Sequence, residues 1–435
     1  MTFTGRYVAL LAIGVVPIVL FGPSMGEAAV VLGGWLLLTI VLGVVDLALA
    51  ASPRRLSLAR SLPSRVRLGE TVASELYLTN TGRRMLRAVV RDGWQPPAGA
   101  GDNRTRVRIP TGERRLVTLA LTPFRRGERR VEQVTVRSFG PLGLWARQAT
   151  LTAPGQIRVL PPFLARKHLP SRIARLKELD GLTSVMVRGQ GTEFDSLREY
   201  VRGDDVRSID WRATARRNDV MVRTWRPERD RRVVILVDTG RTSAARVDDE
   251  PRLDTAFEAS LLLAALASRA GDRVDFVAWD RRVRGRVQGT QGAELLSRMV
   301  DTMALIEPEL IEPDWSAVPA QVRSVTNQRA LVVLLTSVDA AGAASGLLSV
   351  LPQLTSRHTV VVASVTDPQA SRAVRERSTR EEVYRAAAAE RAMLDVARVS
   401  AAIRQLGGEV VTGSPADLPP ALADRYIALK AAGRL

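Results

Sequence analysis

Cysteine is absent from this chain of 435 residues, and histidine occurs only twice, at His168 and His358. The absence of cysteine excludes disulfides and thiolate metal ligands and is consistent with a reducing compartment. The two histidines lie far apart in unlike contexts, so Ser-His catalysis and zinc chemistry have little support. No Walker-type loop is present, and the GQG at 189–191 lacks the third glycine of a dinucleotide-binding fingerprint.

Lysine is also scarce, since it occurs only at Lys167, Lys177 and Lys430, and nearly all basic charge is arginine. The net charge of +18 is uneven: it is −1 over residues 1–51, +20 over 52–232 and −1 over 233–435. A genomic bias toward arginine codons explains part of this content, but it does not explain a neutral C-terminal part. The alternative is that the basic middle faces something anionic, most simply lipid headgroups.

Two apolar runs, 7–21 and 28–51, open the chain and are separated by a short turn. The second run is long enough to span a hydrocarbon core of about 30 Å, and the first is marginal. We interpret residues 1–52 as a transmembrane helical hairpin, with a signal peptide or a buried core hairpin as alternatives. Asp46 in the second run is expected near the membrane interface or against the partner helix.

Arginines follow the second apolar run at once, whereas the turn between the two runs carries only Glu27. By the positive-inside rule, both ends of such a hairpin are cytoplasmic. The sequence therefore predicts a two-pass protein of the cell membrane, with both termini and the globular domains on the cytoplasmic side. The arginines in question are Arg54, Arg55, Arg60, Arg65 and Arg67.

Residues 53–162 are typical of a β-sandwich. Segments such as SELYLTN and RRLVTLALTP alternate apolar and polar residues with a period near two, and turn sequences such as NTG and PTGE separate them. Several such strands without a helical window predict two packed sheets. Within this domain, residues 141–145 (PLGLW) are expected to form a turn that buries Trp145 against the sandwich.

The rest of the chain divides into a charged segment, 163–232, and an α/β domain, 233–435. At 233–238 the sequence becomes VVILVD, an apolar run that suits a strand covered on both faces. Similar strands are expected at 274–279, 330–335, 359–365 and 408–412, with an edge strand at 281–289 and helical patterns between them. This order predicts a doubly wound, Rossmann-like sheet with a ligand crevice at the carboxyl ends of its strands.

Asp238, Gly240 and Thr242 end the first of these strands in the order D-x-G-x-T. A strand-end Asp followed by hydroxyls two and four residues later resembles the metal-ion-dependent adhesion site of a von Willebrand factor type A domain, because Mg²⁺ prefers an octahedron of hard oxygens. Gly240 removes one oxygen, and Asp314 and Asp339 in later loops depart from the expected pattern. Asp238 and Thr242 are thus a degenerate candidate site for Mg²⁺, and a metal-free von Willebrand factor A-like fold is the favoured interpretation.

Three acids of the charged segment, Asp204, Asp205 and Asp210, suggest a second kind of site. With Glu193 and Asp195 nearby, they resemble the carboxylates of a two-metal hydrolase. Arginines are interleaved among them, however, so the carboxylates can instead be neutralised in a structural ion-pair network. The ion-pair network is the favoured interpretation.

The run EFDSLREYVRGDDVRSIDWRATAR, the upstream FGPLGLW, the strand-end DTGRT and the terminal YIALKAAGRL together resemble the bacterial Domain of Unknown Function 58 (DUF58) family. The resemblance implies a membrane-anchored protein with a von Willebrand factor A-like domain that acts with a MoxR-type AAA+ ATPase. The residues of this chain that match the family motif are Gly203, Asp204, Asp205, Arg207, Ile209, Asp210, Trp211, Thr214, Ala215 and Arg216.

These observations lead to one expected function and two alternatives. The expected function is a non-enzymatic adaptor or scaffold that binds a protein partner, a MoxR-type AAA+ ATPase, in cell-envelope or stress-related assembly. The motif residues, beside the carboxyl ends of the sheet, are expected to form the docking surface. The first alternative is a metal-dependent hydrolase that uses the Asp cluster, and the second is binding of an anionic polymer or nucleic acid by the arginine-rich middle. Because that middle lacks interleaved aromatics, no nucleic-acid partner is expected.

Overall fold

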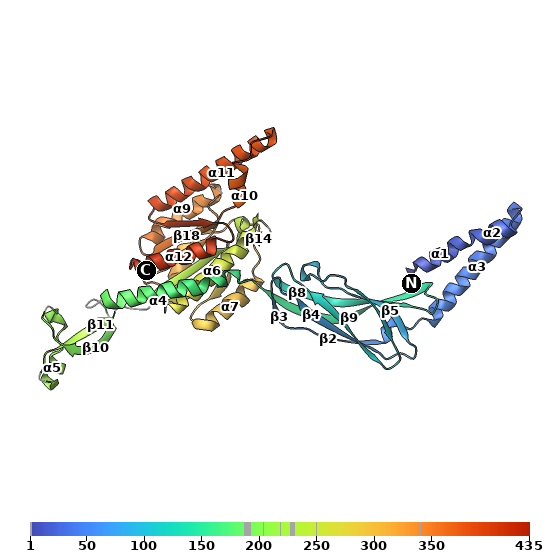
Figure 1. Ribbon diagram of the computed structural model, residues 1–435, viewed down its shortest axis with the longest axis horizontal. Coiled ribbons are helices and arrows are strands. Elements are labelled where there is room, and N and C mark those ends of the chain that lie inside the picture. Colours follow the sequence, from blue (N-terminus) through green and yellow to red (C-terminus); the bar gives the residue numbers. More distant parts are fainter. Residues whose placement is uncertain are drawn as a thin grey trace. The chain divides into compact units, whose positions relative to one another are not determined.

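The computed structural model of the chain describes residues 2–186, 193–202, 204–217, 219–226, 231–248, 250–339 and 341–435. The chain divides into two compact units, residues 1–160 and 161–435 (Figure 1). Each unit has its own sheets and its own buried core, and each is described by itself.

The first unit is built on two largely antiparallel sheets. One has the strand order β1-β9-β8-β5-β6, with β3 paired in parallel to β9, and the other has the order β2-β4-β7. Along β4, buried residues alternate with more exposed ones, because successive side chains of a strand point to opposite faces. The strands are β1 (Thr2–Phe3), β2 (Leu56–Ser61), β3 (Arg65–Arg67), β4 (Val72–Asn80), β5 (Leu86–Asp92), β6 (Arg104–Ile109), β7 (Arg114–Leu121), β8 (Gly127–Phe139) and β9 (Trp145–Leu160).

Side chains of both sheets share one core, in which Leu76 and Leu78 of β4 pack with Val136 of β8. Two facing sheets around such a core agree with the predicted β-sandwich. The sheets are also joined by a buried ion pair, since Arg60 Nη1 of β2 lies 2.7 Å from Asp92 Oδ2 of β5 and the two side chains are only 3% and 5% exposed. This pair holds β2 opposite β5.

Three apolar helices are part of this unit: α1 (Gly5–Ile13), α2 (Val15–Phe21) and α3 (Met25–Leu49). Within the described residues, the helical run Met25–Arg55 is the one long and apolar enough to cross a membrane, with a mean hydropathy of 2.5, and Gly5–Phe21 is a shorter apolar stretch. Such a helix near the N-terminus indicates membrane anchoring or a signal sequence. The second membrane pass stays a prediction.

The end of α3 is attached to the loop between β8 and β9. The buried Asp46 carboxylate accepts hydrogen bonds from the N–H groups of Leu142 (2.8 Å), Leu144 (2.7 Å) and Trp145 (3.2 Å). Trp145 also packs on α3, because a Cβ at Gly43 would lie 2.4 Å from its Cε2 atom. The turn expected to bury Trp145 against the sandwich therefore binds the apolar helix, and Asp46 faces this turn rather than a partner helix.

The second unit is built on a six-stranded sheet of order β16-β15-β12-β17-β18-β19. All neighbours pair in parallel except β16, which is antiparallel to β15. Each strand starts within two residues of a position expected from the sequence, because uninterrupted apolar runs mark strands that are buried on both faces. The strands are β12 (Arg232–Asp238), β15 (Arg273–Trp279), β16 (Val283–Val287), β17 (Leu331–Leu335), β18 (Thr359–Val365) and β19 (Glu409–Gly413).

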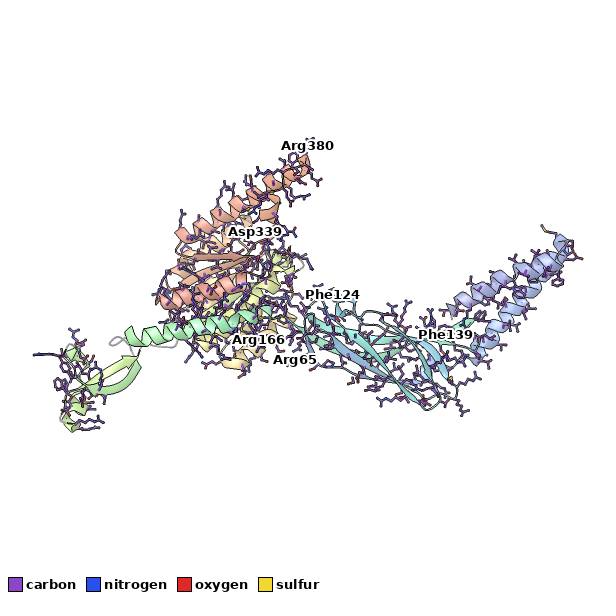
Figure 2. All side chains as sticks on the ribbon, in the orientation of Figure 1. Arg65, Phe124, Phe139, Arg166, Asp339 and Arg380 are labelled. Atoms are coloured by element: carbon purple, nitrogen blue, oxygen red, sulfur yellow. The ribbon has the colours of Figure 1, made fainter. Side chains whose placement is uncertain are left out.

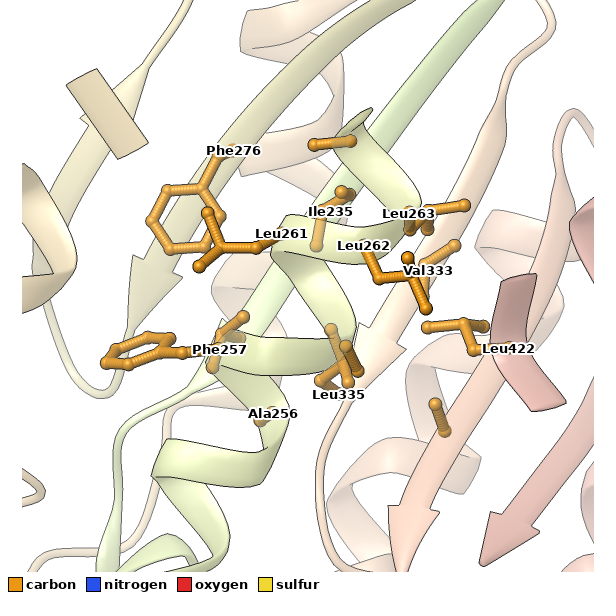
Figure 3. Close-up of a cluster of buried hydrophobic side chains, with 14 of the residues drawn as sticks. Ile235, Ala256, Phe257, Leu261, Leu262, Leu263, Phe276, Val333, Leu335 and Leu422 are labelled. Carbon is orange, nitrogen blue, oxygen red and sulfur yellow. The ribbon is translucent and has the colours of Figure 1, made fainter. Parts of the chain in front are cut away.

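Helices cover both faces of this sheet. Ile235 and Val333 pack against Leu262 on one face (Figure 3), whereas Val234 and Leu236 of the same central strand contribute to a second core on the other face. The first face is covered by α6 (Arg252–Arg269), α7 (Gly292–Leu305) and α12 (Leu418–Ala431), and the second by α8 (Val318–Val325), α9 (Ala341–Thr355) and α11 (Arg380–Gln405).

The C-terminal helix α12 is tied to the start of β15. Asp272 accepts hydrogen bonds from Tyr426 Oη at 2.5 Å and from Lys430 Nζ at 2.7 Å. Burial raises the pKa of Asp272, and the nearby Lys430 opposes this rise. Tyr426 and Lys430 belong to the terminal YIALKAAGRL string, so this part of the family resemblance has a structural role.

Candidate functional site

Residues 193–226, here called the motif hairpin, contain the string that carries the family resemblance. β10 (Glu193–Glu199) pairs antiparallel with β11 (Met221–Arg226), and η4 (Val206–Ser208) and α5 (Trp211–Arg217) lie between them. An isolated bridge between Ile209 and Val222 holds the two short helices beside β11. Gly203 lies outside the described residues, as do the side chains of Glu193 and Asp195.

Each of the three acids of the motif ends a turn or begins a helix. Asp204 accepts from the N–H of Val201 at 2.9 Å and from Arg198 Nη2 at 2.6 Å. Asp205 caps η4 by accepting the N–H of Arg207 at 2.9 Å. These are the bonds by which Asp stabilises turns and helix N-termini.

Asp210 has the largest set of partners in the motif hairpin. Its Oδ1 accepts the N–H groups of Arg212 and Ala213, both at 3.0 Å, and its Oδ2 accepts from Arg223 Nε at 2.8 Å. The hydrogen bond from Ala213, followed by that from Arg223, lowers the pKa of Asp210. Thr214 donates to the Asp210 carbonyl at 2.8 Å and accepts the N–H of Met221 at 3.0 Å, which joins α5 to β11.

This geometry assigns Asp204, Asp205 and Asp210 to capping and ion pairing. Their oxygens already accept donors from the hairpin itself, as the ion-pair interpretation expects. Across the part of the chain that the structure describes, no three His, Asp or Glu side chains are grouped so that they could hold a metal ion. The hydrolase alternative also involves Glu193 and Asp195, whose side chains lie outside the described residues, so it stays a prediction.

The exposed side chains of the motif hairpin include apolar and basic residues. Trp211 is 70% exposed, and Val201 and Val206 are also largely exposed. Arg207 and Arg216 are exposed as well. A bulky aromatic residue left in solvent among arginines is typical of a protein-binding surface rather than of a core.

The carboxyl end of β12 forms a second polar cluster, around Asp238. Its Oδ1 accepts the N–H of Gly240 at 2.7 Å, and its Oδ2 accepts from Thr336 Oγ1 at 2.7 Å and from Thr242 Oγ1 at 3.4 Å. Ser243 Oγ donates to the Asp238 carbonyl at 2.6 Å. Burial raises the pKa of Asp238, and the hydrogen bond from Gly240 opposes this rise.

A loop occupies the space that a side chain at position 240 would need. A Cβ on Gly240 would lie 2.8 Å from the Ile311 carbonyl oxygen and 3.0 Å from Pro313 Cδ. Arg241 donates its N–H to the same Ile311 carbonyl at 2.8 Å, so the loop is bonded in place. The glycine in D-x-G-x-T is thus required by the packing of residues 311–313.

An arginine lies at the neighbouring strand end. Arg252, at the start of α6, donates to Ser337 Oγ at 2.8 Å and forms an ion pair with Asp339. Figure 2 labels Asp339 in the second unit. Burial would raise the pKa of Asp339, but its hydrogen bonds from Arg252 and Ser337 lower it. A small pocket at this edge of the sheet is lined by residues that include Thr242, Ser243, Arg252, Thr336, Ser337 and Leu418.

The residues around Asp238 do not fit an octahedral Mg²⁺ site. The hydroxyls of Thr242 and Thr336 both donate to the Asp238 carboxylate, so these groups already bond to one another. The 311–313 loop fills the place of a third side-chain oxygen. Asp339 is paired with Arg252, and Asp314 caps the helix η6 (Trp315–Ala317) through the N–H of Ser316.

Two residues of this cluster, Thr336 and Arg252, are absent from the sequence-based prediction. Thr336 directly follows β17, the parallel neighbour of β12, so its place next to Asp238 follows from the strand order. Arg252 has no such signal in the sequence, because its position depends on the path of the chain between η5 (Arg241–Ala244) and α6.

Comparison with solved structures gives matches that cover about a quarter of the chain. A CARDB domain from Pyrococcus furiosus is 17% identical and covers 24% of this chain and 91% of its own, with a TM-score of 0.19. A FixG-related protein from Vibrio parahaemolyticus is 8% identical and covers 24% of this chain and 96% of its own, with a TM-score of 0.18.

Comparison with known sequences gives uncharacterized proteins. Two of them, from Mycobacterium bovis and Mycobacterium tuberculosis, are 27% identical to this chain over 186 residues, which is 42% of this chain and 58% of each relative. The chain therefore spans little more than half the length of these relatives. Residues 196–393 match the family model described as protein of unknown function DUF58, which confirms the resemblance drawn from the sequence and places this region in that family.

Proposed function

We propose that this protein is a membrane-anchored, non-enzymatic adaptor whose second unit binds a MoxR-type AAA+ ATPase in a cell-envelope or stress-related assembly. The family resemblance suggests this partner class. The observation that supports a binding role is the motif hairpin, whose acids are bonded internally while Trp211 stays 70% exposed. A surface built for protein binding needs an exposed aromatic anchor and rigid support, and the hairpin has both.

The second unit is proposed to be a von Willebrand factor A-like domain that binds its partner without a metal ion. Support comes from the parallel sheet with one antiparallel edge strand, from the helices on both faces, and from Asp238 at the end of a central strand. In open α/β sheets, ligands bind at the carboxyl ends of the strands. Here Arg252 and the 311–313 loop supply the polar groups at that edge.

The membrane anchor is proposed to be a hairpin in which α3 spans the bilayer and α1 with α2 returns across it. The apolar composition of both segments and the length of α3 support this topology. By the positive-inside rule, the arginines that follow α3 support an orientation with both termini and both units on the cytoplasmic side. The ATPase, which hydrolyses cytoplasmic nucleotide, would then meet the motif hairpin on the cytoplasmic side of the membrane.

Affinity capture with the full chain tests this function. The tagged protein, extracted from membranes in detergent, is mixed with the MoxR-type ATPase of the same organism, with and without nucleotide and Mg²⁺. Trp211→Ala should weaken association by about 30-fold or more, because truncating an aromatic anchor typically costs at least about 2 kcal/mol. The control is Tyr384→Ala, since Tyr384 is similarly exposed on α11, at 65%.

Two results would contradict the adaptor role. One is no association of the unmodified chain in any nucleotide state. The other is an equal loss of binding in Trp211→Ala and Tyr384→Ala, which would show that the motif hairpin has no special part in docking. Because Trp211 is exposed, its substitution is expected to leave thermal unfolding of the chain unchanged, and this measurement accompanies the binding assay.

A further inference from the structure

Basic and apolar side chains surround the end of α3 where it meets the sandwich. Arg84 donates to the Ala48 carbonyl, and Arg147 Nε donates to the Leu47 carbonyl at 3.0 Å, so both satisfy carbonyls at the C-terminus of the helix. The basic collar, as we call it, consists of exposed side chains on β1, on α1, on η1 (Pro53–Arg55), in the turn 81–85 and in the loop 140–144. Its members are Phe3, Arg6, Arg54, Arg55, Arg83, Arg84, Met85 and Leu142.

The parts of the collar are held together by short contacts. Arg6 Nη1 donates to the Leu142 carbonyl at 3.3 Å, which joins α1 to the loop 140–144. The N–H of Thr81 donates to the Arg55 carbonyl at 3.0 Å, which joins the turn 81–85 to η1. Phe3 stacks on Tyr7, with ring centroids 5.4 Å apart, and contacts Trp145 edge-on. The collar therefore consists of two joined pairs of segments, and each pair is bonded to the end of α3, one through Arg84 and the other through Asp46.

The depth of this surface relative to α3 follows from helix geometry. From Met25 to Asp46 the helix rises about 31 Å at about 1.5 Å per residue, which matches a hydrocarbon core of about 30 Å. Asp46 then lies at the boundary of the core, where its carboxylate holds the loop 140–144 through three N–H groups. A bilayer around α3 would place the collar in the headgroup layer.

The composition of the collar suits that layer. Phe3 is 66% exposed and Leu142 is 49% exposed, and both lie beside arginines. Aromatic and aliphatic groups next to cations are favoured where acyl chains meet headgroups. An acid at the same end of the sandwich, Glu113 in the turn before β7, is paired with Arg115 at 3.0 Å, so it does not neutralise the collar.

We propose that the basic collar is a lipid-binding surface that lies in the headgroup layer and binds anionic phospholipid headgroups. This inference rests on the membrane anchor of the proposed function and adds the lipid class and the residues that recognise it. The Asp46 contact fixes the sandwich to α3, so the collar keeps a constant depth instead of moving on a free linker. Each arginine near an anionic surface then favours anionic over zwitterionic lipid by about fivefold.

The experiment uses the full chain in nanodiscs of phosphatidylcholine mixed with phosphatidylglycerol. Since the chain contains no cysteine, Leu142→Cys provides a single thiol for a fluorescent label. Brominated lipids quench the label only when they lie beside it, so quenching by brominated phosphatidylglycerol is compared with quenching by brominated phosphatidylcholine. We expect several-fold stronger association of the anionic lipid at this position.

Two triple variants show whether the selectivity belongs to the collar. Arg54→Gln, Arg55→Gln and Arg83→Gln together should remove most of it. The control triple is Arg91→Gln, Arg104→Gln and Arg106→Gln, three exposed arginines of β5 and β6. Along β5, Val89 pairs with Arg106 four residues beyond Met85 of the collar, and Arg91 pairs with Arg104 six residues beyond it, so the control site lies at least about 14 Å further along the sheet. Because this separation exceeds a Debye length of about 8 Å, the control should keep the selectivity.

The outcomes separate this inference from the anchor on which it rests. Equal quenching by both lipids, or equal loss in both triple variants, would overturn the collar while leaving the anchor in place. Release of the unmodified chain from vesicles by alkaline extraction would instead overturn the anchor itself. Binding of a soluble oligonucleotide that is lost in the collar triple would assign the surface to nucleic acid and would also overturn the proposal.

Discussion

Replacing Asp46 by alanine removes the contact that joins the apolar helix to the sandwich. Hydrogen bonds to a charged acceptor contribute about 1.5–3 kcal/mol each, and a buried donor left without a partner costs about 1–3 kcal/mol. Of the three N–H groups that Asp46 accepts, that of Leu144 is in a buried bond and those of Leu142 and Trp145 are partly accessible to water. We expect Asp46→Ala to lower the free energy of opening of this loop by about 3–5 kcal/mol. Asp46→Asn, which keeps one acceptor oxygen, should lower it by about 1–2 kcal/mol.

Amide hydrogen exchange over residues 142–145 of the full chain in nanodiscs measures this opening directly. At about 1.4 kcal/mol per factor of ten, Asp46→Ala should speed exchange by about 10²- to 4 × 10³-fold. Thr39→Val is the matched control, because Thr39 is equally buried in α3 but its hydroxyl bonds to Leu36 of the same helix. If exchange in Asp46→Ala equals that in Thr39→Val, the loop is held by other contacts and the reasoning is refuted.

Three further predictions concern buried charges and the strand-end cluster. Burial raises the pKa of Asp238, so the folded state keeps the Asp238 proton to higher pH than the unfolded chain does, and stability falls as pH rises between the unfolded and the folded pKa. Asp238→Asn should flatten the plot of Tm against pH between these two values, and an unchanged or steeper plot would contradict this. Gly240→Ser should destabilise the second unit by about 1–3 kcal/mol, because its Cβ meets the Ile311 carbonyl, and Mg²⁺ should not restore the loss of Tm. Arg60→Met should cost about 3–5 kcal/mol in urea unfolding, because the buried Asp92 carboxylate loses its cation and keeps only the hydrogen bond from Trp94 Nε1, and adding Asp92→Leu should recover much of it; no recovery would mean that the pair is not the cause.

The strands of both units are predictable from the sequence because burial sets their pattern. β12 is covered on both faces and reads as an unbroken apolar run, whereas β4 has one inward face and alternates. The helix α4 (Leu169–Met186) falls in the segment interpreted only as charged, although Leu169, Ile173, Leu176 and Leu179 recur at helical spacing. Packing determines which face of α4 is buried, because Leu176 lies in the core that includes Leu253 of α6.

The contacts of the candidate sites are less predictable, because they join residues that are distant in the chain. Asp46 and Leu142 are 96 residues apart, and nothing local indicates that an acid in an apolar helix meets three N–H groups of a loop. The same distant contact explains the glycine at position 140, because a Cβ on Gly140 would lie 2.2 Å from Asp46 Oδ1. The capping roles of Asp205 and Asp210 are the opposite case, because their partners follow within three residues and Asp before a helical turn is a local signal.

Two buried acids of this chain, Asp46 and Asp92, accept hydrogen bonds from donors of the chain itself. Asp46 holds backbone N–H groups, and Asp92 holds Arg60. Arginine exceeds the acids over the chain as a whole, which carries a net charge of +18, and Arg207 and Arg216 of the motif hairpin are exposed. A partner that meets Trp211 beside Arg207 and Arg216 should therefore present acidic side chains, because like charges at an interface oppose association. We expect capture of the ATPase to weaken as salt is raised, and a salt-independent affinity would show that docking relies on apolar contacts alone.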